Sequence, residues 1–323
     1  MNRPARLPLT QQVKEFFLRP YRPLFARLSA VHDQVQKSTR EVHRNSCLVA
    51  DLLIDRIRTN PALTLREAEF AVFSQWGEDG ILQYLISRVP IAEQTFIEFG
   101  VEDYLEANTR FLLVHQNWSG LVLDGNPAQT DAIKKQDIYW RHDLTALPAF
   151  ITRENINALI AQRFRGDVGV MSVDVDGNDY WIWEAIDVVS PRIVICEFNS
   201  VFGVKRAVTV PYDPEFFRTT AHHSNLYFGA SLPALHRLAE RKGYVFVGCT
   251  RAGNDAFFVR RDVAQNVRAL TAEEGYVLSK ARESRDTAGQ YNFVSGADRL
   301  PLIAHLEVFD VDLQKNVRLA EVA

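Results

Sequence analysis

The chain has 323 residues, 24% of them charged and 47% hydrophobic, which is typical of a globular protein. A formal net charge of −3 argues against nucleic-acid binding by bulk electrostatics, and no apolar run of about 18 residues predicts a membrane span. The three cysteines, Cys47, Cys196 and Cys249, lack metal-ligand spacing, and the N-terminus lacks the order of a signal peptide. We therefore expect reduced thiols and a cytoplasmic protein.

Residues 1–62 are predicted to form a basic helical extension. From Leu28 onward, apolar residues recur at alternating steps of three and four, which is typical of a coiled-coil seam and predicts a homo-oligomer. Two alternatives remain: a basic face that contacts an anionic membrane peripherally, with Phe16, Phe17, Leu18 and Phe25, or a helix that packs on its own domain. The seam positions are Leu28, Val31, Val35, Ser38, Val42, Asn45, Val49 and Leu52.

A break at residues 59–61 precedes the main domain, expected over 65–262. Its first motif runs from Ser74 to Gly80 and leads into an apolar helical run, 81–89. Ser74 or Asp79 could cap that helix. Alternatively, Gln75 leans over a cofactor pocket.

The most informative stretch is residues 95–125, which predicts a strand, a loop, a helix and a second, parallel strand. The crossover helix is expected on one face of the sheet. In such sheets ligands bind beyond the carboxyl ends of the strands, where Glu98 and Asp124 would lie. Their spacing is that expected when the second acid accepts hydrogen bonds from a ribose. Alternatively, Glu98 is a structural acid and Asp124 opens a turn. Only Gly100 stands in the loop, which argues against a bound dinucleotide.

A helix over about 128–135 is followed by Ile138–Trp140, which we interpret as a short third strand. Asp143 would then lie at the end of that strand. There it could accept a hydrogen bond from the amino group of a base, or cap the next segment.

The next buried strand, 168–173, delivers Asp174, Asp176 and Asp179 to the same edge. Aspartates at one strand end repel one another, so a divalent metal such as Mg or Mn, a basic side chain or a shared proton should neutralise them. The following strand also ends in polar side chains, Glu197 and Asn199. Four strands that end in an acid or an asparagine at one edge indicate a shared site.

The long irregular segment 200–225 ends with His222 and His223. Either histidine could act as a general base or join the aspartates as a metal ligand, or both could simply be exposed. A helix then leads to two strands, 244–249 and 254–259, whose spacing is that of an antiparallel hairpin. Residues 263–323 are expected to form a C-terminal extension that covers the domain or binds a partner.

The sequence resembles the FkbM-type family of S-adenosylmethionine-dependent methyltransferases over about residues 70–260. The resemblance implies the class I fold: a Rossmann-like α/β domain with a mostly parallel seven-stranded sheet and a closing antiparallel strand, here with an N-terminal helical extension. The shared motifs are Ser74–Gln75 with Asp79, Phe96–Gly100, Glu106–Thr109, Trp118–Leu121 with Asp124, Val173–Gly177, and Gly229–Leu232 leading to Gly243.

The resemblance also implies a cofactor site. Glu98 and Gly100 would line the methionine side, Asp124 would hold the ribose and Asp143 would approach the adenine. The shared motifs add Gln75, Asn108 and Thr109 to the candidate cofactor-binding residues. The chain departs from the family in the loop Gly100-Val-Glu-Asp-Tyr, where many members carry a second glycine, and Glu102 and Tyr104 could narrow or disable the pocket. It also departs at Asp124-Gly125, where many members carry Glu-Pro.

The first functional hypothesis is an O-methyltransferase that uses S-adenosyl-L-methionine to methylate a hydroxyl of a sugar, polysaccharide or related natural product. Asp174, Asp176, His222 or His223 would orient and deprotonate the acceptor, or a metal held by the two aspartates would lower the pKa of the hydroxyl. The alternative is a non-catalytic scaffold with a degenerate methyltransferase fold. A nicotinamide oxidoreductase is disfavoured by the missing glycines.

Overall fold

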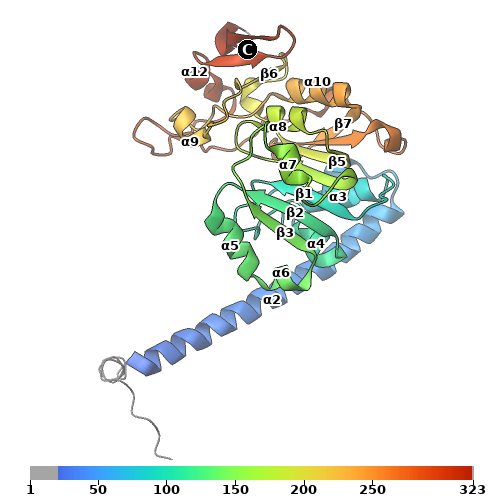
Figure 1. Ribbon diagram of the computed structural model, residues 1–323, viewed down its shortest axis with the longest axis vertical. Helices are drawn as coiled ribbons and strands as arrows, with labels where there is room; N and C mark the ends of the chain where they lie inside the picture. The colour runs from blue at the N-terminus through green and yellow to red at the C-terminus, as the bar shows by residue number, and fades with distance from the viewer. Residues whose placement is uncertain (1–20, 322–323) are drawn as a thin grey trace, which may run out of the picture. The chain divides into compact units, whose positions relative to one another are not determined.

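The computed structural model describes residues 21–321 (Figure 1). The chain divides into two compact units, with the boundary between Asp51 and Leu52. No helix of the described residues combines the length and the apolarity that a membrane span requires.

In the first unit, the described chain is the N-terminal part of helix α2 (Arg22–Thr59). The helix confirms the helical interpretation of the three-four repeat. Coiled-coil pairing stays a prediction, and Phe16, Phe17 and Leu18 lie outside the described residues. The seam side chains Leu28, Val31, Val35, Val42 and Val49 are all exposed.

The second unit is built on a seven-stranded sheet in the order β3-β2-β1-β4-β5-β8-β7. Strands β1 to β5 pair in parallel, and β8 pairs antiparallel with both β5 and β7. This confirms the predicted fold class, including the closing antiparallel strand. The strands are β1 (Thr95–Phe99), β2 (Ser119–Asp124), β3 (Leu144–Pro148), β4 (Gly166–Val173), β5 (Val189–Glu197), β7 (Tyr244–Cys249) and β8 (Asp255–Arg260).

Helices cover both faces of the sheet (Figure 1). Successive strand residues point to opposite faces, so Ile97 and Phe99 join one apolar core while Phe96 joins the other. Burial on both faces explains why the strands are continuous apolar runs. The first core contains α7 (Ile156–Ile160), α8 (Asp179–Ala185) and α10 (Leu232–Lys242); the second contains α3 (Glu78–Ile86), α4 (Arg110–Gln116), α5 (Pro127–Lys135) and α6 (Asp137–Arg141).

The predicted third strand at Ile138–Trp140 is wrong. These residues lie in α6, where Ile138 is buried and Arg141 pairs with Asp137 one turn earlier. The true strand, β3, begins only at Leu144. A single turn of helix and a short strand both place one or two apolar residues inward, so the short apolar run did not distinguish them.

A second sheet of three strands, in the order β10-β9-β6, is formed largely by the C-terminal segment. It surrounds a small core that includes Val208, Ile303 and Val308. Its strands are β6 (Val208–Thr209), β9 (Glu307–Asp310) and β10 (Lys315–Arg318), and the remaining short helices of the unit are α9 (Arg218–Ala221), α11 (Ala272–Gly275) and α12 (Leu300–Ile303).

Candidate functional site

Two cavities meet at the carboxyl edge of the parallel strands. The first, of about 530 Å³, lies beyond β1, β2 and β4, and the second, of about 780 Å³, lies beyond β4 and β5. Both volumes fall within the ordinary range for ligand sites. The side chains that line both cavities are Glu102, Asp174, Asp176 and Arg218.

Gly100 brings the loop after β1 against the loop after β4. Its φ of +69° is a left-handed conformation, and a Cβ built there would lie 2.1 Å from the carbonyl oxygen of Asp174. Only glycine satisfies both conditions. The close approach lets the two loops form one continuous wall of the first cavity, which Gly100 lines as predicted.

Asp124 lines the first cavity with a carboxylate that two backbone N–H groups hold in place. The N–H of Glu102 donates to Oδ2 at 2.8 Å, and the N–H of Asn126 donates to Oδ1 at 2.7 Å. A carboxylate oxygen can accept a further hydrogen bond, so both oxygens remain able to accept from a vicinal diol. The turn and the ribose interpretations of Asp124 are therefore compatible.

Glu98 is buried in β1 and binds the chain at the start of α4. Its carboxylate accepts from the N–H of Asn108 at 2.7 Å and from the N–H and hydroxyl of Thr109 at 3.0 and 2.5 Å. Burial raises the pKa of Glu98 to about 7, although these hydrogen bonds oppose the rise. Glu98, Asn108 and Thr109 line neither cavity, so the geometry is that of the structural alternative.

The motif at 74–79 folds around Asp79. One carboxylate oxygen of Asp79 accepts the backbone N–H groups of residues 72, 73 and 74, and the Ser74 hydroxyl accepts from the N–H of Asp79. Neither residue is the N-cap of α3, which is Gly77 and makes no side-chain capping bond, but both side chains are engaged in holding the loop before the helix. Gln75, which the resemblance assigned to the cofactor, lines the second cavity and not the first.

Asp143 lies away from both cavities. Because β3 begins after it, Asp143 is at the amino end of that strand, where its exposed carboxylate pairs with Arg163 at 2.5 Å. The prediction that Asp143 approaches a base therefore fails together with the third-strand assignment. The residues that follow β3 into the first cavity are Ala149, Phe150 and Ile151. They are apolar, so a prediction based on acidic residues at strand ends could not identify them.

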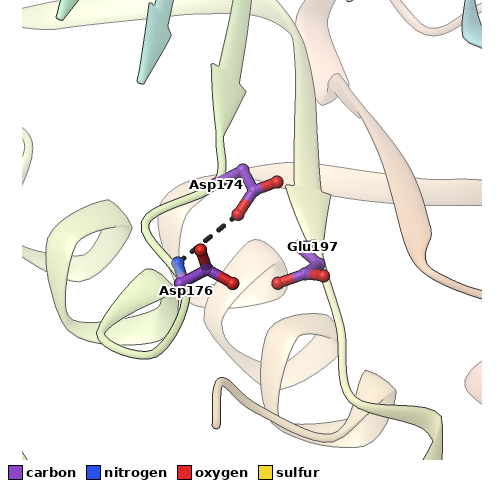
Figure 2. A group of neighbouring side chains, drawn as sticks. All are labelled: Asp174, Asp176 and Glu197. Carbon is purple, nitrogen blue, oxygen red and sulfur yellow. Dashed lines mark hydrogen bonds between the residues drawn. The ribbon is translucent and has the colours of Figure 1, made fainter. Parts of the chain in front are cut away.

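Three carboxylates converge where the cavities meet. Oxygen atoms of Asp174, Asp176 and Glu197 all lie within 4.8 Å of one another, and Figure 2 shows the three side chains pointing together. Burial raises the pKa values of Asp174 and Glu197 well above the ordinary range, and the neighbouring carboxylates raise them further. Glu197 was predicted to end its strand at this edge, but its convergence with the two aspartates was not foreseen.

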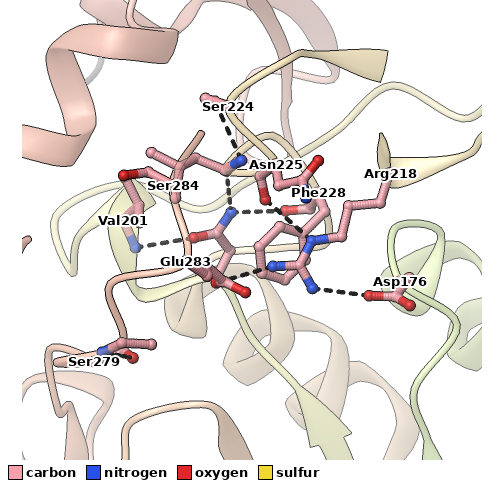
Figure 3. A network of polar contacts seen from close by, with 12 residues as sticks. Asp176, Val201, Arg218, Ser224, Asn225, Phe228, Ser279, Glu283 and Ser284 are labelled. Carbon is pink, nitrogen blue, oxygen red and sulfur yellow. Dashed lines mark hydrogen bonds and ion pairs between the residues drawn. The ribbon is translucent and has the colours of Figure 1, made fainter. Parts of the chain in front are cut away.

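Arg218 supplies positive charge beside this acid cluster (Asp174, Asp176 and Glu197). Its guanidinium pairs with Asp176 at 2.8 Å and with Glu283 at 2.9 Å, and it lies 3.6 Å from the centroid of the Phe228 ring (Figure 3). The sequence predicted that a metal, a basic side chain or a shared proton neutralises the repelling carboxylates at this edge. The structure provides the basic side chain, from the segment before the paired histidines.

His222 and His223 line neither cavity. Their rings are tilted by 42° to each other with centroids 4.1 Å apart, and Nδ1 of His222 lies 2.8 Å from the Ser224 hydroxyl. Burial lowers the pKa of His222, and nearby His223 and His305 lower it further. The structure thus does not bring the histidines to the acid cluster.

The C-terminal extension forms one wall of the second cavity, through residues 279–281, Glu283 and Arg299. Ser279 is held by its N–H, which donates to the Ser200 hydroxyl at 3.0 Å, and by its carbonyl, which accepts from Arg299 at 2.5 Å. Arg299 is fully buried, and Glu283 adds the ion pair to Arg218. The extension is therefore part of the candidate site.

No protein-family model and no curated protein matches the chain. Among solved structures, it is similar to the N-terminal domain of EvdMO1 with SAH bound, at 13% identity and a TM-score of 0.39, over 69% of this chain and 96% of that one. It is also similar to an O-methyltransferase family protein from Burkholderia thailandensis, at 12% identity and a TM-score of 0.34, over 68% of this chain and 70% of that one. A SAM-dependent methyltransferase from Aquifex aeolicus gives 11% identity and 0.34, over 57% and 88%. Such remote similarity carries no inference about activity.

Proposed function

We propose that this protein is a class I methyltransferase of the FkbM type, which uses S-adenosyl-L-methionine to methylate a hydroxyl group of a sugar, polysaccharide or related natural product. The observation that carries the proposal is the meeting of two cavities at Asp174, one with a preoriented acid for a ribose and one with an acidic cluster for a hydroxyl. The motifs shared with the FkbM-type family support the finer assignment.

The first cavity fits a nucleoside without phosphate. Asp124 offers two oriented oxygens to a diol, and Phe150 and Ile151 offer apolar contact to a flat base. Gly100 allows a ligand to lie close against the backbone. When bound, S-adenosylmethionine supplies an electrophilic sulfonium methyl group.

The second cavity places an acceptor hydroxyl beside the acid cluster. Asp174 or Glu197 then removes the hydroxyl proton as the oxygen attacks. Burial and the neighbouring carboxylates raise the pKa of each group, which makes each a stronger base once it is ionised. A positioned base contributes roughly 10²- to 10⁴-fold in rate. Holding donor and acceptor in line contributes on the order of 7 kcal/mol or more.

A divalent metal is a further proposal for the acid cluster. Asp174, Asp176 and Glu197 offer the carboxylate oxygens that Mg and Mn prefer, and a bound ion would lower the pKa of the acceptor hydroxyl. Glu197 Oε2 is buried without a hydrogen-bond partner in the described chain, which suits a ligand atom. Arg218 competes for this role because it already pairs with Asp176.

The test combines cofactor binding with methyl transfer to a panel of sugars and glycans. We expect the wild type to transfer methyl groups from S-adenosylmethionine to at least one hydroxyl acceptor. The double variant Asp174→Asn, Glu197→Gln should still bind cofactor but transfer at least about 100-fold more slowly, as loss of a general base predicts. Full turnover by that variant would overturn the assigned role. Failure of the wild type to bind cofactor at millimolar concentration would favour the scaffold.

A further inference from the structure

Glu102 holds an unusual backbone conformation at the point where the two cavities meet. Its φ is +48°, in the left-handed region that costs a residue with a Cβ roughly 1–2 kcal/mol. Tyr104, two residues later, is also left-handed, at +61°. Strained residues persist where the surrounding structure fixes them, and they cluster at functional sites.

The surroundings of the loop explain how this conformation is held. The N–H of Glu102 donates to Asp124, and the buried Tyr104 hydroxyl bonds to the hydroxyl of Thr109 at 2.9 Å. The carbonyl of Tyr104 accepts from the buried Arg110 at 2.5 Å. Tyr104 is therefore part of the core and does not narrow the cavity. These contacts orient the backbone, and none of them uses the side chain of Glu102.

The Glu102 side chain is exposed and lines both cavities. Within residues 21–321 it makes no side-chain hydrogen bond or ion pair. Of the other side chains common to both cavities, Arg218 and Asp176 are paired with each other, and Asp174 is half-buried in the acid cluster. Glu102 is thus the carboxylate at the meeting point whose side chain has no partner among the described residues.

Given the proposed function, a methyl group must cross from the first cavity to the second, so the atoms that exchange it lie beside the side chains that line both. We propose that Glu102 makes this site select the cationic methyl donor over the neutral product. Its carboxylate attracts the positively charged sulfonium of S-adenosylmethionine. Transfer forms a carbon–oxygen bond, breaks a carbon–sulfur bond and passes the hydroxyl proton to the acid cluster. The sulfur is then an uncharged thioether that Glu102 no longer attracts, which favours product release.

The test is calorimetric titration of the full chain with S-adenosylmethionine and, separately, with S-adenosylhomocysteine. Glu102→Gln should weaken binding of the donor about tenfold and leave binding of the product within about twofold, since two unit charges several ångströms apart at intermediate dielectric interact on that scale. The matched control is Glu106→Gln, an exposed glutamate of the same loop that lines neither cavity. It should change neither affinity.

A second variant, Glu102→Gly, removes the charge and also the backbone strain. It should lose donor selectivity as Glu102→Gln does, while its thermal midpoint stays equal to or above that of the wild type, which separates loss of charge from loss of folding. Equal weakening of both ligands by Glu102→Gln, or no weakening, would overturn the inference. Absence of binding of either ligand to the wild type would instead overturn the proposed function.

Discussion

Substitution of Gly100 by alanine should test how the candidate site is built. The new Cβ would lie 2.1 Å from the carbonyl oxygen of Asp174 and 3.1 Å from its carbonyl carbon. The left-handed backbone alone costs about 1 kcal/mol with a Cβ, and the forced shift of the neighbouring loop should cost about 1–3 kcal/mol more. We therefore expect Gly100→Ala to lower the free energy of unfolding by about 2–4 kcal/mol.

The matched control for this prediction is Gly243→Ala at the end of α10. Gly243 has a similar left-handed conformation, with φ of 82°, but nothing lies within 4 Å of a Cβ built there. Chemical denaturation should show a loss of only about 1 kcal/mol for the control. Calorimetry should show weakened cofactor binding for Gly100→Ala alone. Equal destabilisation by both variants, with cofactor affinity unchanged in both, would refute the close approach of the two loops.

Three other outcomes are expected. Burial and nearby Glu78 raise the pKa of Asp255 well above its ordinary value, so ionisation opposes folding and stability should fall as pH rises above about 4. Asp255→Asn should reduce the loss of unfolding free energy between pH 5 and pH 8, as measured by chemical denaturation. An unchanged dependence of the unfolding free energy on pH would contradict this assignment. Arg218→Gln removes the cation beside the acid cluster, so calorimetry should show Mn²⁺ binding about tenfold tighter; unchanged affinity would exclude competition between Arg218 and a metal. We propose that α2 pairs with a second copy of this chain, so Val35→Asp with Val42→Asp should yield monomers by light scattering, and an unchanged mass would contradict it.

The sequence predicted the strand tips well because buried parallel strands are continuous apolar runs whose ends are marked by the first polar residue. This signal correctly located Asp124, Asp174 and Glu197 at one edge. It failed at Ile138, where a run of three residues fits a helical turn as readily as a strand. Because of that error, Asp143 was predicted at the carboxyl end of the third strand, whereas it lies at the amino end of β3.

Other parts of the site depend on contacts between residues that are far apart in the chain. The pairing of Arg218 with Glu283 joins residues 65 positions apart, and the approach of Arg299 to Ser279 is set by the fold of the C-terminal extension. No local periodicity encodes such contacts. Similarly, adjacency in sequence suggested a role for His222 and His223, but the fold turns His222 toward Ser224 and His305.

The most direct test of the central claim is titration of S-adenosylmethionine into the wild type and into Asp124→Asn. The claim is that the carboxyl edge of the sheet holds a nucleoside through Asp124, so the wild type should bind one equivalent. The variant should stay folded and bind about 10- to 100-fold more weakly, the loss expected for hydrogen bonds to a charged group. Equal affinity of the two proteins, or no binding by the wild type at millimolar cofactor, would contradict the claim.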